Sequence, residues 1–137
     1  MKESKWMIYG AYGYSGELMV REALKQGLKP IVAGRIAEKL TPIANELGLE
    51  YRVFSVKDAG SHLQDISVLL NCAGPFSATA EALVKACLSQ QVHYLDITGE
   101  IDVFRKCYEL DNEAKSQNVI VMPGVGTDIV PTDCLAA

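Results

Sequence analysis

The sequence predicts an α/β fold, a doubly wound parallel sheet of about six strands with helices on both faces. Short apolar segments alternate with longer amphipathic segments along the whole chain. The connections between them are short, and each pair of strands has a helical segment available as its crossover. The strand predicted at 68–72 is apolar on both faces, as a strand in the middle of a parallel sheet must be.

Each strand is predicted from a short apolar run that turn-forming residues interrupt. The first run, Trp6-Met7-Ile8-Tyr9, ends at Gly10. By the same signals we expect strands at 6–9, 30–33, 51–56, 68–72, 94–97 and 119–122.

The helices are predicted from apolar residues at helical spacing and from their stop signals. Gly27 ends the first helix and Gly48 ends the second. Pro42 lies inside the second segment, so this helix is expected to start late or to kink. The predicted helices are 15–26, 36–47, 61–64, 79–90 and 103–116.

The length of 137 residues suits one domain with a single core. The six-strand unit uses nearly all of the chain and leaves nothing for a separate substrate-binding domain. We therefore expect 1–137 to be one domain of a longer polypeptide.

Composition disfavours several classes of function. A net charge of −4 gives no support to binding of nucleic acid or of a membrane surface. No apolar run approaches the roughly 20 residues of a membrane span, and no signal peptide is recognised, so we expect a cytoplasmic protein. The four cysteines are widely spaced and only two histidines accompany them, His62 and His93. We expect free thiols, with neither a metal site nor disulfides.

A glycine-rich loop follows the first predicted strand. Its glycines are Gly10, Gly13 and Gly16, spaced G-x-x-G-x-x-G. Such glycines allow a tight turn, close approach of a diphosphate to the backbone, and close packing of helix on strand. The following helix offers unpaired N–H groups to an anion. The loop predicts a dinucleotide site in a Rossmann fold, with Tyr12, Tyr14 and the Ser15 hydroxyl beside the ligand; the alternative is a purely structural turn.

The end of the second strand favours NADP over NAD. NAD sites usually place a carboxylate here, on the ribose 2′-hydroxyl. This chain has Arg35, whose planar, permanently charged group suits a 2′-phosphate, and Lys39 lies one helical turn later. The alternative is a pair of solvated surface cations.

Small residues end the fourth strand, where the ribose and nicotinamide of the cofactor are expected. They are Cys72, Ala73, Gly74 and Pro75, although Gly-Pro also marks a plain turn. A nucleophilic role for Cys72 is disfavoured, because no histidine lies near it in sequence.

No catalytic residue is assigned from the sequence. Asp96 and Glu100 follow the fifth strand and serve either as acid and base or as a helix cap. Asp128 and Asp133 lie after the sixth strand, where Thr132 or Asp133 is a candidate N-cap.

Four stretches together resemble the NADP-binding domain of saccharopine dehydrogenase-like oxidoreductases. They are 10–16, 71–76, 94–100 and 126–133. The family often has GATGYTG in the first, YVDITGE in the third and GFDSVPSD in the fourth. The departures are Tyr12 for a small threonine, and Thr127 and Ile129 in the last stretch.

The resemblance implies NADP(H)-linked hydride transfer to a small-molecule substrate held by a missing domain, which often also forms a dimer interface. A homodimer is therefore a candidate assembly. No tyrosine has lysine four residues later, which excludes the catalytic pair of short-chain dehydrogenases. Two alternatives stay open: a non-catalytic module that senses NADP and regulates a partner protein, and a Rossmann scaffold without ligand.

Overall fold

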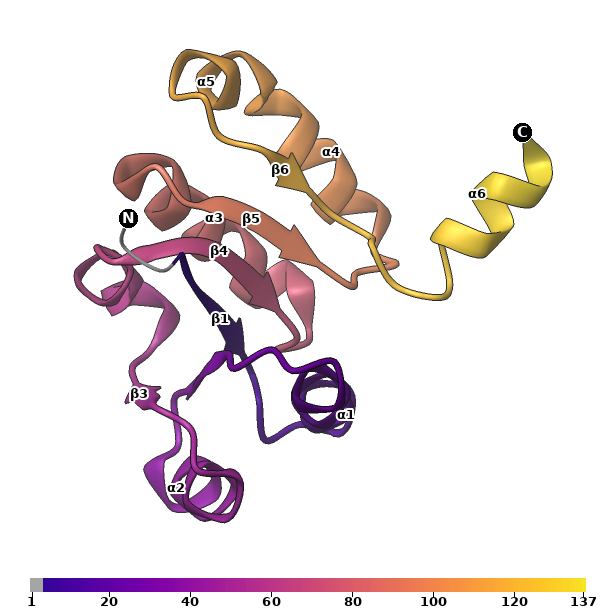
Figure 1. Cartoon of the computed structure of the whole chain (residues 1–137). Coiled ribbons are helices and arrows are strands. Elements are labelled where there is room, and N and C mark those ends of the chain that lie inside the picture. Colours follow the sequence, from indigo (N-terminus) through magenta and orange to yellow (C-terminus); the bar gives the residue numbers. More distant parts are fainter. Residues whose placement is uncertain (1–3) are drawn as a thin grey trace.

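The computed structural model describes residues 4–137, in which six parallel strands form one sheet (Figure 1). The order is β3-β2-β1-β4-β5-β6. This order reverses between β1 and β4, and ligands of such sheets bind outside the carboxyl ends of the strands at that point. The strands are β1 (Lys5–Tyr9), β2 (Ile31–Gly34), β3 (Tyr51–Val53), β4 (Ile66–Asn71), β5 (His93–Asp96) and β6 (Val121–Met122).

Helices cover both faces of the sheet, as the sequence predicted. On one face lie α1 (Tyr14–Lys25) and α2 (Ala37–Leu47). On the other lie the 3₁₀-helix η1 and the helices α3, α4 and α5. Their bounds are Val56–His62, Phe76–Gln90, Ile101–Glu109 and Asp111–Ser116.

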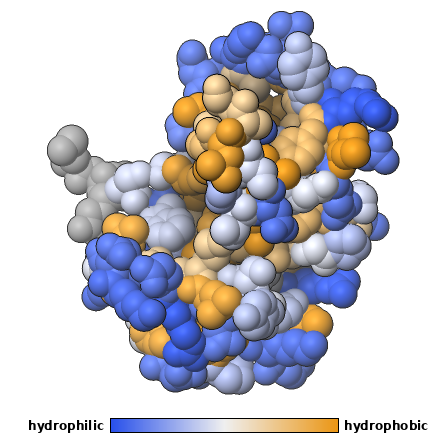
Figure 2. Space-filling model, turned by 90° about the vertical axis from the view of Figure 1, so that its right-hand side faces the viewer, coloured by the Kyte–Doolittle hydropathy of each residue, from blue (hydrophilic) through white to orange (hydrophobic). Residues whose placement is uncertain are grey.

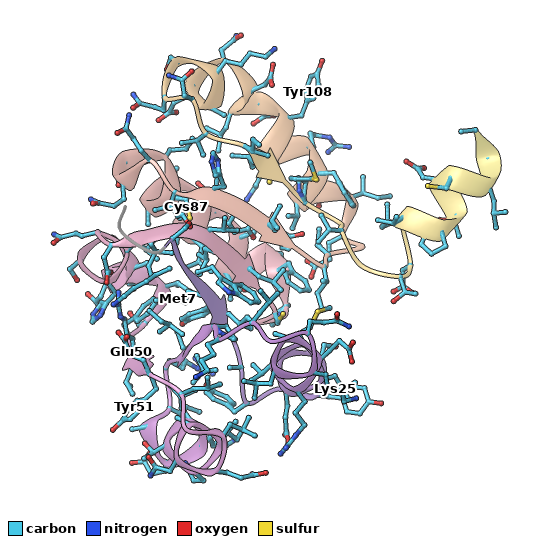
Figure 3. The ribbon with its side chains drawn as sticks, in the orientation of Figure 1. Met7, Lys25, Glu50, Tyr51, Cys87 and Tyr108 are labelled. Atoms are coloured by element: carbon cyan, nitrogen blue, oxygen red, sulfur yellow. The ribbon has the colours of Figure 1, made fainter. Side chains whose placement is uncertain are left out.

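The two faces of the sheet form two separate apolar layers. Ile8 and Val32 point into the layer under α1 and α2. Met7 and Cys87 belong to the other layer, and both lie in the interior of the molecule in Figure 3. Full burial of one such aliphatic side chain contributes about 1.5–3 kcal/mol. Alternate residues of each central strand therefore fix both layers at once.

The predicted strand 51–56 is too long, and its last part belongs to η1. Phe54 still donates its N–H to the Gly34 carbonyl at 3.0 Å. Its ring then turns into the core against Tyr9, with 5.1 Å between ring centroids. The chain leaves the sheet there, and the short helix predicted at 61–64 is the end of Val56–His62.

Several other bounds differ from the prediction. Helix α3 begins at Phe76, because a carboxylate distant in sequence caps its first N–H groups. The helix predicted at 103–116 divides at Leu110, which packs against the core. Helix α2 runs through Pro42 from Ala37 without a late start. The last strand is only Val121–Met122.

Helix α6 (Val130–Ala136) extends away from the rest of the molecule in Figure 1. Its N-cap is Ile129, not Thr132 or Asp133. Val130 is 46% exposed and Leu135 is 87% exposed. Figure 2 shows this side of the molecule, with apolar residues gathered around its middle and hydrophilic residues along its rims. Within residues 4–137, no helix is long and apolar enough to cross a membrane.

Candidate functional site

The carboxyl ends of β1, β2, β3 and β4 enclose a groove of about 600 Å³. We call it the main groove. Its size lies within the range typical of sites for small molecules and cofactors. Nine of the twelve predicted cofactor residues line it: Gly10, Tyr12, Gly13, Arg35, Lys39, Cys72, Ala73, Gly74 and Pro75.

The glycines of the first loop are required by the packing of α1 on the sheet. Gly10 has a φ of +80°, and a Cβ there would lie 2.7 Å from the Ala73 backbone nitrogen. A Cβ on Gly16 would collide with the carbonyl oxygen of Gly10. These two glycines therefore serve the turn and the close helix contact, and both Gly10 and Gly13 line the main groove.

The first turn of α1 presents backbone donors without acceptors. Gly13 is the N-cap and provides no side-chain bond. The first hydrogen bond of the helix runs from the Glu17 N–H to the Gly13 carbonyl at 2.9 Å. In the described part of the chain, the N–H groups of Tyr14, Ser15 and Gly16 have no acceptor. Such donors, with the positive end of the helix dipole, bind anions.

Cations without acidic partners gather at the main groove. The sequence has 13 lysines and arginines, and all but Lys2 lie in 4–137. Eight of these twelve form ion pairs with carboxylates. The four that form none within 4–137 are Lys29, Arg35, Lys39 and Lys57, and the last three line the main groove.

Tyr12, the residue that departs from the usual loop motif, lies over the end of β2. A Cβ on Gly34 would collide with a ring atom of Tyr12, so the ring in its present position packs directly on the Gly34 backbone. Tyr9, which also lines the groove, donates its hydroxyl to the Phe54 carbonyl at 3.1 Å. Burial raises the pKa of Tyr9, and Tyr12 raises it further. Tyr9 and Tyr12 both line the main groove at the ends of β1 and β2.

Tyr14 and Ser15 do not line the main groove. They line a neighbouring cleft of about 270 Å³, together with Ile97 and the segment 126–129. Tyr14 is 86% exposed. The amino end of α1 therefore stands between two concave surfaces, one toward β2 and β3 and one toward β5 and β6.

Asp96 is fully buried, and hydrogen bonds occupy both of its carboxylate oxygens. Oδ2 accepts the Tyr94 hydroxyl at 2.7 Å. Oδ1 accepts the N–H groups of Thr98 and Gly124 at 3.0 and 2.9 Å. Burial, then the carboxylate of Asp96, raises the pKa of Tyr94. Asp96 thus orders the loops after β5 and β6 and has no free edge directed at a ligand.

The same network continues to the wall of the main groove. The Asn71 amide donates to the Tyr94 hydroxyl at 3.1 Å and accepts the Ala73 N–H at 3.0 Å. Thr79 accepts the other amide hydrogen and donates to the Ala73 carbonyl at 2.7 Å. No buried side-chain polar atom in 4–137 lacks a partner. The loop after β4 is therefore held in one conformation.

Glu100 caps a helix other than its own. Its two carboxylate oxygens accept the N–H groups of Phe76 and Ser77 at 2.7 and 2.9 Å. These bonds, the one from Phe76 first, lower the pKa of Glu100. Of the two roles left open by the sequence, this geometry supports a cap, on α3. Sequence spacing did not point to it, because the contact joins the loop after β5 to the loop after β4.

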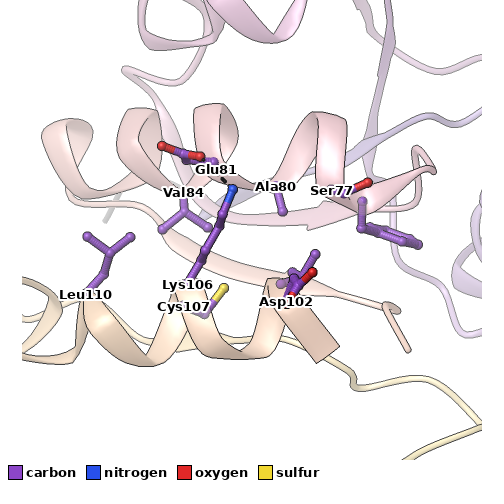
Figure 4. Close-up of a pocket in the computed structure, with 10 residues that line it drawn as sticks. Ser77, Ala80, Glu81, Val84, Asp102, Lys106, Cys107 and Leu110 are labelled. Atoms are coloured by element: carbon purple, nitrogen blue, oxygen red, sulfur yellow. Dashed lines mark hydrogen bonds and ion pairs between the residues drawn. The ribbon is translucent and has the colours of Figure 1, made fainter. Parts of the chain in front are cut away.

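Other reactive groups are structural. Burial, with a further contribution from Asp96, raises the pKa of Cys72 to about 12, so at neutral pH its thiol is not a nucleophile. In 4–137 no three His, Cys, Asp or Glu residues are grouped to hold a metal ion. Figure 4 shows a small crevice of about 30 Å³ between α3 and α4, where Lys106 pairs with Glu81 at 3.2 Å. It is far too small for a dinucleotide.

Sequence reasoning missed a second wall of the main groove. Ser55, Val56 and Lys57 line it from η1, and Thr79 lines it from α3. The η1 wall follows from the strand order of the folded sheet: β3 lies beside β2, so the residues after β3 reach the same edge as Arg35. The overlong strand predicted at 51–56 concealed this turn.

Comparisons with known proteins agree with the fold and the loop. Residues 6–122 match the family described as saccharopine dehydrogenase NADP binding domain. A saccharopine dehydrogenase-like oxidoreductase of Bos taurus is 25% identical over 150 residues, which cover 93% of this chain and 35% of that protein. A trans-acting enoyl reductase of Mycobacterium leprae is 31% identical, over 96% of this chain and 34% of its own length. The chain thus spans about a third of these relatives.

Among solved structures, the apo saccharopine dehydrogenase (L-Glu forming) of Saccharomyces cerevisiae superposes with a TM-score of 0.77. The match covers 91% of this chain and 28% of that one, at 18% identity. A UDP-glucose-4-epimerase from Stenotrophomonas maltophila with bound NAD gives 0.67 at 12% identity, over 88% of this chain and 52% of that one. At these identities the likeness concerns the fold.

Proposed function

The chain belongs to the saccharopine dehydrogenase NADP-binding domain family, and we propose that it orients NADP(H) for hydride transfer to a small-molecule substrate. The observation that carries the proposal is a groove with three cations that form no ion pair within the described residues, next to helix N–H groups that have no acceptor there. In a chain with a net charge of −4, such a gathering favours a ligand with several phosphates.

Each part of the site has a role in this proposal. The N–H groups at the start of α1 bind the diphosphate. Arg35 and Lys39 bind the 2′-phosphate, and Arg35 also stacks on the adenine. The residues 72–75 of the main groove lie along the ribose toward the nicotinamide, and the neighbouring cleft lined by Ile97 and 126–129 receives the nicotinamide ring. When bound, NADP(H) supplies or accepts the hydride, and this chain positions it.

The substrate side of the reaction is proposed to lie in another domain. Three groups that the sequence raised as candidates are already engaged: Asp96 and Glu100 hold loops, and Cys72 is a buried thiol. The relatives are about three times as long as the aligned region. We propose that a domain outside 1–137 binds the substrate in this protein also.

The structural roles of Asp96, Glu100 and Cys72 are equally compatible with a second candidate, a module that senses NADP(H) and regulates a partner protein. Both candidates require cofactor binding and differ only in turnover. Incubation of the full-length protein with NADPH and keto-acid, imine or enoyl substrates separates them. Oxidation of NADPH supports the enzyme, and binding without oxidation of NADPH supports the sensor.

Calorimetric titration with NADP⁺ and NAD⁺ tests the shared premise. We expect a preference for NADP⁺ that Arg35→Ala reduces by about ten- to a hundredfold, the loss of a charge-assisted bidentate contact. Arg105→Ala is the control, because Arg105 is exposed on α4 and pairs with Asp102. Equal affinity for both nucleotides in the unaltered protein would contradict the assignment of Arg35.

A further inference from the structure

We propose that Lys57 is a further specificity-determining residue, which faces the 2′-phosphate from the side opposite Arg35 and Lys39. The inference rests on the proposed function and adds a second wall to its anion site. It starts from the strand order, the ion pairs and the packing of η1.

The strand order brings Lys57 to the same edge of the sheet as Arg35. Strands β2 and β3 are parallel neighbours, with Gly34 beside Val53. Arg35 follows the last residue of β2, and η1 begins three residues after the end of β3. The hydrogen bond from the Phe54 N–H to the Gly34 carbonyl ties the two exits together. Lys57 and Arg35 therefore line one groove from two adjacent strand ends.

The charge of Lys57 is not neutralised by a neighbouring carboxylate. Asp58, the next residue, accepts a hydrogen bond from the Ser55 hydroxyl at 2.9 Å and does not line the main groove. Lys57 forms no ion pair with any described carboxylate. Lys29 also lacks one but does not line the main groove.

A phosphate monoester at the ribose 2′ position suits this arrangement. It carries nearly two negative charges at neutral pH and three acceptor oxygens. Arg35 offers a planar fork on one side, and Lys57 offers a compact charge on a flexible stem from the other. A ribose 2′-hydroxyl is neutral and gains nothing from a second cation. Lys57 therefore acts on the difference between the two nucleotides.

The segment that carries Lys57 is anchored independently of its side chain. Ala59 and Leu63 are fully buried. The ring of His62 stacks on Phe54 with 4.5 Å between centroids, and Arg52 donates to the His62 carbonyl at 2.6 Å. Lys57 itself is exposed. Its replacement should therefore leave the fold and the position of η1 unchanged.

The test uses two small probes that need no nicotinamide contact: adenosine 2′,5′-bisphosphate and AMP. Calorimetry compares the unaltered chain with Lys57→Ala, Lys57→Arg and the matched control Lys29→Ala. We expect Lys57→Ala to weaken the bisphosphate by about three- to tenfold, as the loss of one solvent-exposed charge contact should. AMP affinity should stay within about twofold, and Lys57→Arg should restore the bisphosphate. The salt dependence of bisphosphate binding should become shallower in Lys57→Ala.

The outcomes separate this inference from the function on which it rests. If the unaltered chain prefers the bisphosphate but Lys57→Ala binds like Lys29→Ala, the role of Lys57 is refuted and the proposed function stands. Equal weakening of both probes refutes a role in specificity. If the unaltered chain binds the two probes equally, the 2′-phosphate site itself is refuted. Thermal unfolding of each variant verifies that it is folded.

Discussion

At the carboxyl edge of the sheet, the two halves differ in whether their polar groups have partners within the protein. After β1, β2 and β3, the main groove holds three cations that form no ion pair within residues 4–137, and it lies beside helix N–H groups that have no acceptor in that range. After β4, β5 and β6, the buried polar side chains of Asn71, Tyr94 and Asp96 all have partners. The first half is arranged for an anion, and the second forms a rigid frame behind it.

The contrast follows from solvent exposure. An exposed cation or helix end keeps its hydration until a ligand replaces the water, so it costs little without a partner. A buried polar group without a partner costs about 1–3 kcal/mol. Polar groups without a protein partner are therefore tolerated in the exposed main groove, whereas every buried polar group around Asp96 needs a hydrogen-bond partner. Changes in the frame should cost stability, and changes in the groove should cost affinity.

The largest effect is expected from Asp96→Ala. The change leaves the Tyr94 hydroxyl and the N–H groups of Thr98 and Gly124 without their acceptor. We expect a loss of about 3 kcal/mol or more in the free energy of unfolding, measured in urea. Asp102→Ala, at an exposed ion pair, should change it by less than about 0.5 kcal/mol. Similar losses of unfolding free energy in both variants would show that the hydrogen bonds of Asp96 contribute little to stability.

Gly16→Ala should have the next largest effect, because it affects both halves of the comparison. The added Cβ meets the Gly10 carbonyl, a backbone atom that cannot turn away. We expect a loss of about 1–3 kcal/mol from overpacking, with weaker NADP⁺ binding as the loop shifts. Gly60→Ala is the control, since a Cβ there has no neighbour within 4 Å. Unchanged stability and binding in Gly16→Ala would rule out the close packing of α1 on the loop.

The next effect concerns a cation of the first half that does have an acidic partner: Arg52 pairs with Asp65, and this pair should make stability depend on pH. Hydrogen bonds from Arg52 hold the pKa of Asp65 well below its ordinary value of 3.8. A lowered folded-state pKa gives stability that is present above the ordinary value and lost as the pH falls below it. The urea midpoint should therefore drop below about pH 4. Asp65→Asn should flatten this drop, and an unchanged pH profile would contradict it.

The smallest effect concerns the reactivity of two thiols. Burial raises the pKa of Cys72 to about 12, whereas Cys134 is exposed on α6. At pH 8, iodoacetamide should label Cys134 quickly and Cys72 only when the fold opens. Peptide mass spectrometry over time gives both rates. Fast labelling of Cys72 in the folded chain would show that the loop after β4 is open rather than rigid.

Local patterns along the chain were enough to predict the α/β alternation, the parallel sheet, the turn glycines and the cations after β2. These features depend on local periodicity and on backbone positions that accept only one residue type, glycine. Gly10 and Gly16 are of this kind, since any side chain there meets the neighbouring backbone. Local signals also located most of the main groove, because strand ends are readable in order along the chain.

Which distant residues share an edge of the sheet depends on the folded arrangement of the strands. Glu100 caps α3, Asp96 joins the loops after β5 and β6, and Lys57 faces the groove beside Arg35. Nothing in the spacing of these residues indicates such contacts, because they depend on the lateral order of the strands. Which strands lie next to each other in a parallel sheet depends on the crossover connections and on the burial of both faces of the sheet. These are properties of the whole chain.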